Sequence, residues 1–211
     1  MAAKQLLLDP DTPDVDVLGV AARTLAAGDL VGYPTDTLYG LAADPRQPAA
    51  VARLFHVKRR QTGMAIPLVA ADLAQAETGA GILTPVGRRL AQRFWPGALA
   101  LVVDASAALD HRLLGEGQTV AVRVPANAVA RALARLFDYP ITATSANRSG
   151  GAAAITAAEV VDIFGATVDV VLDAGPTPGG SPSTIVDVRG DVPRLVREGV
   201  VPWDRVLQSL A

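Results

Sequence analysis

Two hydrophobic periodicities alternate along this chain, and each change from one to the other marks the boundary of an element. Apolar positions three and four residues apart predict amphipathic helices, whereas short continuous apolar runs predict buried strands. Helices are predicted over residues 14–28, 48–58, 84–95, 127–137, 156–165 and 202–211. Strands are predicted over residues 29–34, 65–70, 98–105, 119–125, 141–146, 168–175, 183–188 and 193–198.

The order of these elements predicts the fold class. Helices and strands are interspersed, which favours an α/β fold with α+β character, in which helices flank one open, twisted, mostly mixed sheet. We expect a single domain over residues 1–211, with Lys4 in a frayed terminal tail. The longest segment without a predicted element is the glycine- and proline-rich stretch 173–182, and loops of this length are often functional.

The composition mainly excludes certain classes of protein and certain kinds of site. The 211 residues are half apolar, which is enough for a sizeable core, yet no apolar run reaches the roughly 18–20 residues that span a bilayer. The first residues carry no signal-peptide pattern, so a cytoplasmic protein without a membrane contact is expected. Cysteine is absent and only two histidines are present, which excludes disulfides and thiolate chemistry and nearly excludes multi-histidine metal sites. With a net charge of −2, any nucleic-acid contact requires a local basic patch.

The rarity of lysine singles out one segment. Of the 19 basic side chains only Lys4 and Lys58 are lysines, and Lys58 lies in the dense positive run HVKRRQTG. Lys58 and Arg60 are two residues apart, a spacing that puts both on one face of an extended segment and leaves Arg59 facing solvent. Two cations on one face would clamp a phosphate through charge-assisted hydrogen bonds. Taken alone, the run is equally compatible with a solvated turn.

Small polar groups gather at the ends of two predicted strands. The segment YPTDTLYG places Thr35, Asp36 and Thr37 after a buried strand, and threonine hydroxyls suit an amino-acid or nucleotide ligand. Ser145 and Asn147 in ITATSANRSG repeat the two-residue spacing at a strand end, where open α/β sheets bind ligands. Capped turns are the alternative for both segments, and Asp36 in particular is also compatible with a plain turn cap.

Two arginines lie in or beside apolar strands. Arg123, within TVAVRVP, is costly to bury unless a protein carboxylate or an anionic ligand pairs with it. The sequence is equally compatible with either partner. Arg197 ends a predicted strand, and Ser183 and Thr184 follow the loop 173–182 directly. The common phosphate-loop, dinucleotide, zinc-protease and serine-hydrolase motifs are absent, so phosphate binding would depend on cationic side chains.

Together these segments resemble the YrdC/TsaC family of threonylcarbamoyl-AMP synthases. The resemblance rests on seven motifs in the family's order, within roughly residues 15–200: PTDTLYGLAADP, K-x-R followed by IPL, FWPG, TVAVRVP, TSANRSG, GPTPGGSPSTIVDV and LVREG. It implies a YrdC-like fold with a large, positively lined concave cavity, in the family's short single-domain form. The chain departs from the family pattern at Arg59, where glycine is usual, at Met64, where lysine or asparagine is common, and in FWPGALA, which lacks P-G-P-x-T.

The resemblance also implies an activity. Family members form threonylcarbamoyl-adenylate and pyrophosphate from L-threonine, bicarbonate and ATP, with Mg²⁺ on the phosphates and no metal ligands expected from the protein. A separate transferase complex then moves the threonylcarbamoyl group to tRNA beside the anticodon. A carbamate is already a nucleophile, so the reaction requires no covalent enzyme intermediate, in agreement with a chain that lacks cysteine.

Carried over to this chain, the resemblance implies specific site residues. The catalytic tetrad would be Lys58, Arg60, Ser145 and Asn147. ATP would be bound by this tetrad together with Thr119 and Arg197. L-Threonine would be bound by Thr35, Thr37, Arg123, Thr144 and Ser183, with the choice between Thr35 and Thr37 open. Arg123 would face the threonine carboxylate, and Arg123→Ala is therefore expected to abolish threonine binding while leaving the fold intact.

Two other functions compete with this one. The chain could be an RNA-binding or ribosome-maturation module, with a basic surface built from Arg53, Arg59, Arg88, Arg89 and Arg93. A weak contact with tRNA or double-stranded RNA is also compatible with the synthase. Alternatively, the chain could be a catalytically divergent paralogue of the same fold, and the intact tetrad argues against this.

Overall fold

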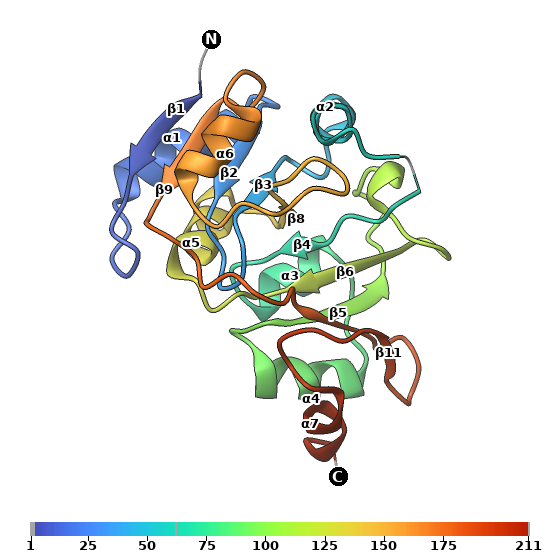
Figure 1. The fold of residues 1–211 in the computed structure, drawn as a ribbon. Helices are drawn as coiled ribbons and strands as arrows, with labels where there is room; N and C mark the ends of the chain where they lie inside the picture. The colour runs from blue at the N-terminus through green and yellow to red at the C-terminus, as the bar shows by residue number, and fades with distance from the viewer. Residues whose placement is uncertain (1–2, 62, 211) are drawn as a thin grey trace.

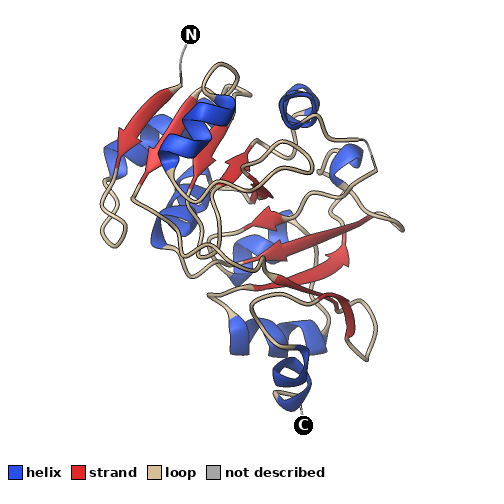
Figure 2. Ribbon diagram, viewed as in Figure 1, coloured by secondary structure: helices blue, strands red, loops and turns tan. Residues whose placement is uncertain are grey.

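The chain folds into two mixed sheets with helices packed against them (Figures 1 and 2). The computed structural model describes residues 3–61 and 63–210, so the predictions for residues 1–2 and 211 lie outside the described residues. The mixed α/β class is confirmed, whereas the prediction of one open sheet is wrong. None of the helices in these two ranges has the length and apolar character needed to cross a bilayer.

The element bounds follow the predicted ones closely for the helices and less closely for the strands. The helices are α1 (Val15–Ala26), α2 (Pro48–Lys58), α3 (Leu73–Gly79), α4 (Pro85–Phe94), α5 (Ala128–Phe137), α6 (Ala157–Phe164) and α7 (Trp203–Gln208), with a 3₁₀ turn at His111–Leu113. The strands are β1 (Lys4–Leu7), β2 (Val31–Tyr33), β3 (Gly40–Ala42), β4 (Leu68–Val69), β5 (Leu99–Asp104), β6 (Thr119–Arg123), β7 (Ile141–Thr142), β8 (Thr144–Ser145), β9 (Val170–Asp173), β10 (Thr184–Asp187) and β11 (Arg194–Arg197).

Side-chain chemistry at the helix starts explains where several helices begin. Thr84 caps α4 by accepting from the Gly87 N–H, and Pro85 occupies the first turn, as predicted. Thr156 and Glu159 form a reciprocal capping box at the start of α6. These caps satisfy backbone N–H groups that have no partner inside the helix.

The five-stranded sheet is covered by helices on both faces. Its order is β1-β9-β2-β3-β8, with β1, β9 and β2 parallel and β3 and β8 antiparallel to their neighbours. Successive side chains of β9 alternate between faces: Val170 and Leu172 pack with α1 and α5, and Val171 packs with α2 and α6. Lys4 pairs with Val170 in the edge strand β1, so the expected frayed tail is wrong.

The six-stranded sheet, in contrast, is covered by helices on one face. Its order is β11-β10-β5-β6-β4-β7. Leu101 and Val122 pack with α3, α4 and α7 on the covered face. Ala100, Ile185 and Arg123 belong to the other face and line a cavity. Because β6 alternates, Arg123 points out of the core that its neighbour Val122 fills.

The two sheets meet where the chain passes from one to the other. The run predicted as one strand over 141–146 is two short strands: β7 pairs with β4 in the six-stranded sheet, and β8 pairs with β3 in the five-stranded sheet. Between them, the Ala143 N–H donates to the Pro67 carbonyl at 2.8 Å. The crossing places Ser145 at the junction of the sheets.

Candidate functional site

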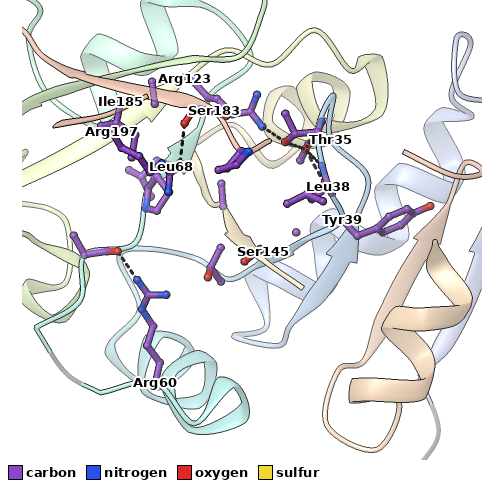
Figure 3. Close-up of a pocket in the computed structure, with 18 residues that line it drawn as sticks. Thr35, Leu38, Tyr39, Arg60, Leu68, Arg123, Ser145, Ser183, Ile185 and Arg197 are labelled. Carbon is purple, nitrogen blue, oxygen red and sulfur yellow. Dashed lines mark hydrogen bonds between the residues drawn. The ribbon is translucent and has the colours of Figure 1, made fainter. Parts of the chain in front are cut away.

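A cavity of about 370 Å³ lies at the junction of the two sheets (Figure 3). The five-stranded sheet contributes the loop after β2 and strand β8, and the six-stranded sheet contributes its uncovered face. The polar side chains that line the cavity are Thr35, Thr37, Tyr39, Arg60, Arg123, Thr144, Ser145, Ser183 and Arg197. The fold therefore brings eight of the implied site residues to one cavity, while Lys58, Thr119 and Asn147 are not among those that line it.

Lys58 lies behind the cavity wall, in contact with two other members of the implied tetrad. Its side chain is 1% exposed, and Nζ donates to the Asn147 carbonyl at 2.7 Å, to Asn147 Oδ1 at 3.2 Å and to the Ser145 carbonyl. Ser145 Oγ donates to Asn147 Oδ1 at 2.7 Å. Asn147 Nδ2 donates to the Gly151 carbonyl at 2.7 Å, which connects the network to the turn that follows. Of these three side chains, only Ser145 reaches the cavity.

The expected extended segment around Lys58 and Arg60 is wrong. Lys58 is the last residue of α2, and Arg59 adopts the left-handed conformation at φ 50° and ψ 40°. This conformation favours glycine, the residue that the resemblance leads one to expect at this position. The Arg59 side chain is exposed, as predicted. Burial, and then the nearby Arg60 charge, lower the pKa of Lys58 to about 7.

Arg60 lies at one end of the cavity, and no carboxylate pairs with it among the described residues (Figure 3). Its Nε donates to the Met64 carbonyl at 3.2 Å and its Nη2 to the Ala65 carbonyl at 2.9 Å. Burial lowers the pKa of the guanidinium, as expected for a cation that has lost water without gaining an anion.

At the other end of the cavity, Thr35 and Thr37 differ in how many hydrogen bonds their hydroxyls make to the protein backbone. Thr35 Oγ1 donates to the Leu38 carbonyl at 2.7 Å and accepts from the backbone N–H groups of Thr37 and Leu38 at 3.2 and 3.3 Å. Thr37 Oγ1 has side-chain neighbours only, Thr35 Oγ1 at 3.1 Å and Arg123 Nη2 at 3.5 Å. The Thr37 hydroxyl is thus the freer of the two.

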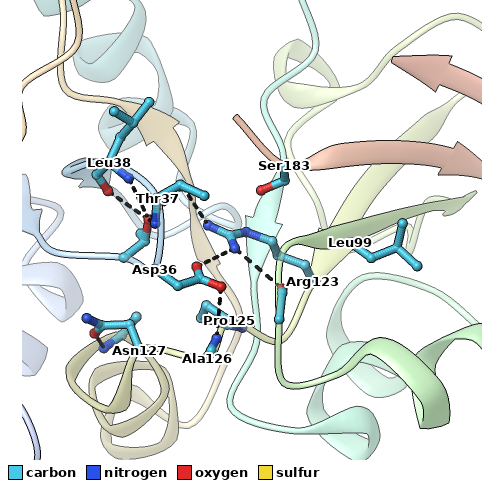
Figure 4. Close-up of polar contacts among 12 residues, drawn as sticks. Asp36, Thr37, Leu38, Leu99, Arg123, Pro125, Ala126, Asn127 and Ser183 are labelled. Atoms are coloured by element: carbon cyan, nitrogen blue, oxygen red, sulfur yellow. Dashed lines mark hydrogen bonds and ion pairs between the residues drawn. The ribbon is translucent and has the colours of Figure 1, made fainter. Parts of the chain in front are cut away.

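Arg123 has a protein carboxylate as one partner, which is one of the two partners that the sequence left open (Figure 4). Its Nη1 donates to Asp36 Oδ1 at 2.5 Å, and Asp36 Oδ2 accepts from the Ala126 N–H at 3.1 Å. Asp36 is therefore more than a turn cap, and its importance was missed. The available signal was an aspartate between two threonines in a chain that also places an arginine in an apolar strand.

Arg197 approaches the same end of the cavity from the edge strand β11. Its Nη2 donates to the Ser183 carbonyl at 2.8 Å. Burial, and then the Arg123 charge, lower the pKa of Arg197, so these two cations lie close enough to repel one another. An anionic ligand between them would relieve this repulsion.

The structure places Thr119 beside the cavity rather than on its wall. Thr119 begins β6, is buried, and donates from Oγ1 to the Glu116 carbonyl at 3.1 Å. Its implied contact with ATP remains a prediction. Across residues 3–61 and 63–210, no cluster of three histidine, aspartate or glutamate side chains is arranged to hold a metal ion.

The comparisons with known proteins can be set against this geometry. A family model described as Sua5_yciO_yrdC, telomere recombination, matches residues 23–199. The chain belongs to the Sua5/YciO/YrdC family. It is 41% identical over 164 residues to a protein of Thiobacillus denitrificans named threonylcarbamoyl-AMP synthase, covering 78% of this chain and 87% of that protein.

Longer family members are also similar. A Pyrococcus abyssi protein named threonylcarbamoyl-AMP synthase is 36% identical over 187 residues, which cover 89% of this chain. The chain spans only 55% of that relative's length. The crystal structure of P. abyssi Sua5 complexed with L-threonine matches with a TM-score of 0.91 at 32% identity, covering 98% of this chain and 60% of that one. The family and fold expected from the sequence motifs are thus confirmed.

The basic surface expected for an RNA-binding or ribosome-maturation module does not form as one patch. Arg53 of α2 pairs with Asp29 and Asp169, and Arg88 of α4 pairs with Glu77. Helices α2 and α4 also lie on opposite sides of the molecule (Figure 1). The five arginines proposed for that surface are therefore divided between two regions, and part of their charge is neutralised.

Proposed function

We propose that this chain is an L-threonylcarbamoyladenylate synthase, which joins L-threonine, bicarbonate and ATP and releases pyrophosphate. The observation that carries the proposal is the charge of the cavity, whose described lining has three arginines and no carboxylate. Such a wall suits a ligand that is itself strongly anionic, such as ATP, next to an amino-acid carboxylate. Family membership and the names of the two relatives support the same reaction.

The amino acid is assigned to the end of the cavity formed by Arg123, Ser183 and Thr144, with Thr37 preferred over Thr35. This assignment is supported by the guanidinium of Arg123 on the wall and by the freer Thr37 hydroxyl. The L-threonine in the P. abyssi Sua5 crystal structure agrees with an amino-acid ligand. Arg123 would bind the carboxylate, while the hydroxyls would orient the amine and the side chain.

The triphosphate is assigned to the end formed by Arg60 and Ser145. Arg197, which lies at the other end beside Ser183, and Thr119, which lies beside the cavity, would contact other parts of the ATP. Arg60 has no carboxylate partner within the described residues, so its charge is available to a phosphate. Lys58 and Asn147 would support Ser145 from behind through the network that joins the three residues.

The proposed reaction needs positioning more than it needs a nucleophile on the protein. The threonine amine adds to CO₂ formed from bicarbonate and loses a proton, which gives a carbamate. A carbamate oxygen attacks the α-phosphorus of ATP, the bond from that phosphorus to the bridging oxygen of the β-phosphate breaks, and pyrophosphate leaves. Arginines at fixed positions would stabilise the charge that builds up on the phosphate oxygens. Mg²⁺ would enter as part of the substrate MgATP, with the phosphates supplying most of its ligands.

The product would be used in tRNA modification. We propose that a separate transferase complex accepts the threonylcarbamoyl group and delivers it to tRNA, with at most a weak RNA contact from this chain. This role would place the protein in the cytoplasm.

The decisive experiment measures the reaction directly. Purified protein is incubated with L-threonine, bicarbonate and MgATP, and both pyrophosphate and threonylcarbamoyl-AMP are quantified. Each product is expected only when all three substrates are present. Arg60→Ala is expected to lower the rate at least tenfold, because roughly this factor follows from one lost charge-assisted hydrogen bond to the substrate. If the protein binds RNA but forms no pyrophosphate, the synthase assignment is wrong.

A further inference from the structure

The loop between β2 and β3 places a carboxylate against the one arginine that β6 directs into the cavity (Figure 4). Asp36 lies in a loop that joins two strands of the five-stranded sheet, Arg123 lies in the six-stranded sheet, and their side chains are only 14% and 8% exposed. Asp36 uses both oxygens on donors from the other side of the junction, Arg123 Nη1 and the Ala126 N–H. The carboxylate therefore fixes the arginine from one direction.

The rest of the guanidinium is left for another partner. Nη1 is engaged by Asp36, with a long 3.5 Å contact to the Gly97 carbonyl, whereas the only contact of Nη2 within the described residues is Thr37 Oγ1 at 3.5 Å. Figure 4 shows Asp36 and Ser183 on different sides of the Arg123 guanidinium. The planar fork of arginine can bind one carboxylate along one edge and a second group along another.

We propose that Asp36 is the positioning residue of the amino-acid site: it aims Arg123 so that the free part of the guanidinium binds the substrate carboxylate. Asp36 does not itself contact the substrate in this proposal, which rests on the proposed function. Without Asp36, the long arginine side chain would sample several rotamers. Ligand binding would then have to fix one of them, and this entropic cost would weaken the affinity. The selectivity for a carboxylate-bearing ligand would fall with it.

Asparagine is the sharpest substitution because it keeps the shape and changes only the bonding. Both groups that face Asp36 are donors, Arg123 Nη1 and the Ala126 N–H. An asparagine has one acceptor oxygen and one donor NH₂, so Asp36→Asn can satisfy only one of them. The variant is expected to release Arg123 while disturbing the cavity little.

The test compares three ligands on wild type and Asp36→Asn by calorimetry: L-threonine, L-threoninamide and MgATP. L-Threoninamide lacks the carboxylate, so it reports on everything in the amino-acid site except the Arg123 contact. Asp36→Asn is expected to weaken L-threonine binding roughly ten- to hundredfold, as for the loss of one charge-assisted contact, and to leave the affinities for L-threoninamide and MgATP unchanged. Asp110→Asn is the matched control, because Asp110 is also buried and bound to an arginine, Arg112, but Arg112, unlike Arg123, does not line the cavity.

The outcomes separate this inference from the proposed function. If wild type binds L-threonine and Asp36→Asn binds it equally well, the positioning role is overturned while the proposed function stands. If the variant loses all three ligands together with thermal stability, Asp36 is a structural residue and the inference is likewise overturned. If wild type itself binds no L-threonine, the proposed function fails and the inference fails with it.

Discussion

The ammonium group of Lys58 is surrounded by protein acceptors rather than open to the cavity. The carbonyls of Ser145 and Asn147 and the Asn147 side-chain oxygen use all three of its hydrogens. Three acceptors that converge on one atom suit the compact charge of lysine and not the planar fork of arginine. A chain that uses arginine almost everywhere therefore has a structural reason for lysine here, namely to hold the turn that carries Ser145.

The buried Lys58 predicts that stability depends on pH. Burial, and then Arg60, lower its pKa from 10.5 to about 7 in the folded protein. Between these values the unfolded chain binds more protons than the folded one, so the free energy of unfolding rises with pH. From about pH 6.5 to 10, urea denaturation is expected to show wild type gaining ~2–4 kcal/mol relative to Lys58→Met. A constant difference across this range would mean that the three acceptors keep the amine charged.

Residue types at the site were predictable from the sequence, but their partners were not. The polar clusters at two strand ends marked Thr35, Thr37 and Ser145 as candidates, and the structure brings these residues to one cavity. Asp36 escaped notice because its partner Arg123 lies 87 positions away, and local sequence cannot distinguish a turn cap from half of an ion pair. The expected contact of Lys58 with phosphate remains a prediction, and its bonds to the backbone carbonyls of Ser145 and Asn147 could not be predicted from the sequence.

At the scale of elements, local chemistry determined what could be predicted. The Thr84 cap and Pro85 correctly marked the start of α4. The seven-residue α3 and the three-residue β3 were missed, because neither is long enough to show a period. The end of α2 at Lys58 was predicted correctly, but the chain after it was expected to be extended. An arginine does not indicate the left-handed backbone conformation that Arg59 adopts.

The strap formed by residues 174–183 illustrates how a loop without regular structure is fixed. It connects β9 to β10, and Pro182 and Ser183 at its end line the cavity. The Tyr39 hydroxyl, on a fully buried ring, donates to the Gly175 carbonyl at 2.7 Å. Farther along, the Gly179 N–H donates to the Thr37 carbonyl at 2.9 Å, so the strap is tied to the segment that carries the cavity threonines.

Tyr39→Phe is therefore expected to loosen the strap. The substitution removes one hydroxyl and leaves the Gly175 carbonyl without that donor, at a cost of about 1–2 kcal/mol. Hydrogen exchange at the Gly179 amide is expected to accelerate, because this amide is protected by its hydrogen bond to the Thr37 carbonyl, the next bond that holds the strap in place. Tyr139→Phe is the control: it removes a similar 2.9 Å bond to the Gly79 carbonyl, far from the strap in sequence. Equal exchange at Gly179 in both variants would contradict the prediction.

At the scale of the molecule, the division into two sheets could not be read from the sequence. The run 141–146 looks like one strand, and only the partners of its two halves reveal that they belong to different sheets. Because such pairings join residues distant in sequence, hydrophobic pattern alone does not specify them. The same applies to β6, which was predicted as a buried strand and in fact turns Arg123 toward the cavity.

The Asp36–Arg123 pair joins these two sheets, and this changes what Arg123→Ala is expected to do. The substitution was expected to abolish threonine binding and leave the fold intact. In the structure it would also leave the Asp36 carboxylate largely buried without its cation, and we now expect a loss of about 2–4 kcal/mol in the free energy of unfolding, somewhat less than for a fully buried pair.

Adding Asp36→Asn to Arg123→Ala is expected to recover part of that stability, because a neutral amide needs no counter-ion. Arg189→Ala is a suitable control: the Arg189 side chain is 37% exposed and pairs with Asp187, two residues away, and with the exposed Asp104, and each such solvent-accessible pair contributes at most about 1 kcal/mol. Urea denaturation of the four proteins measures each difference. If Arg123→Ala is no less stable than Arg189→Ala, the pair does not hold the sheets together, and its role is confined to the cavity.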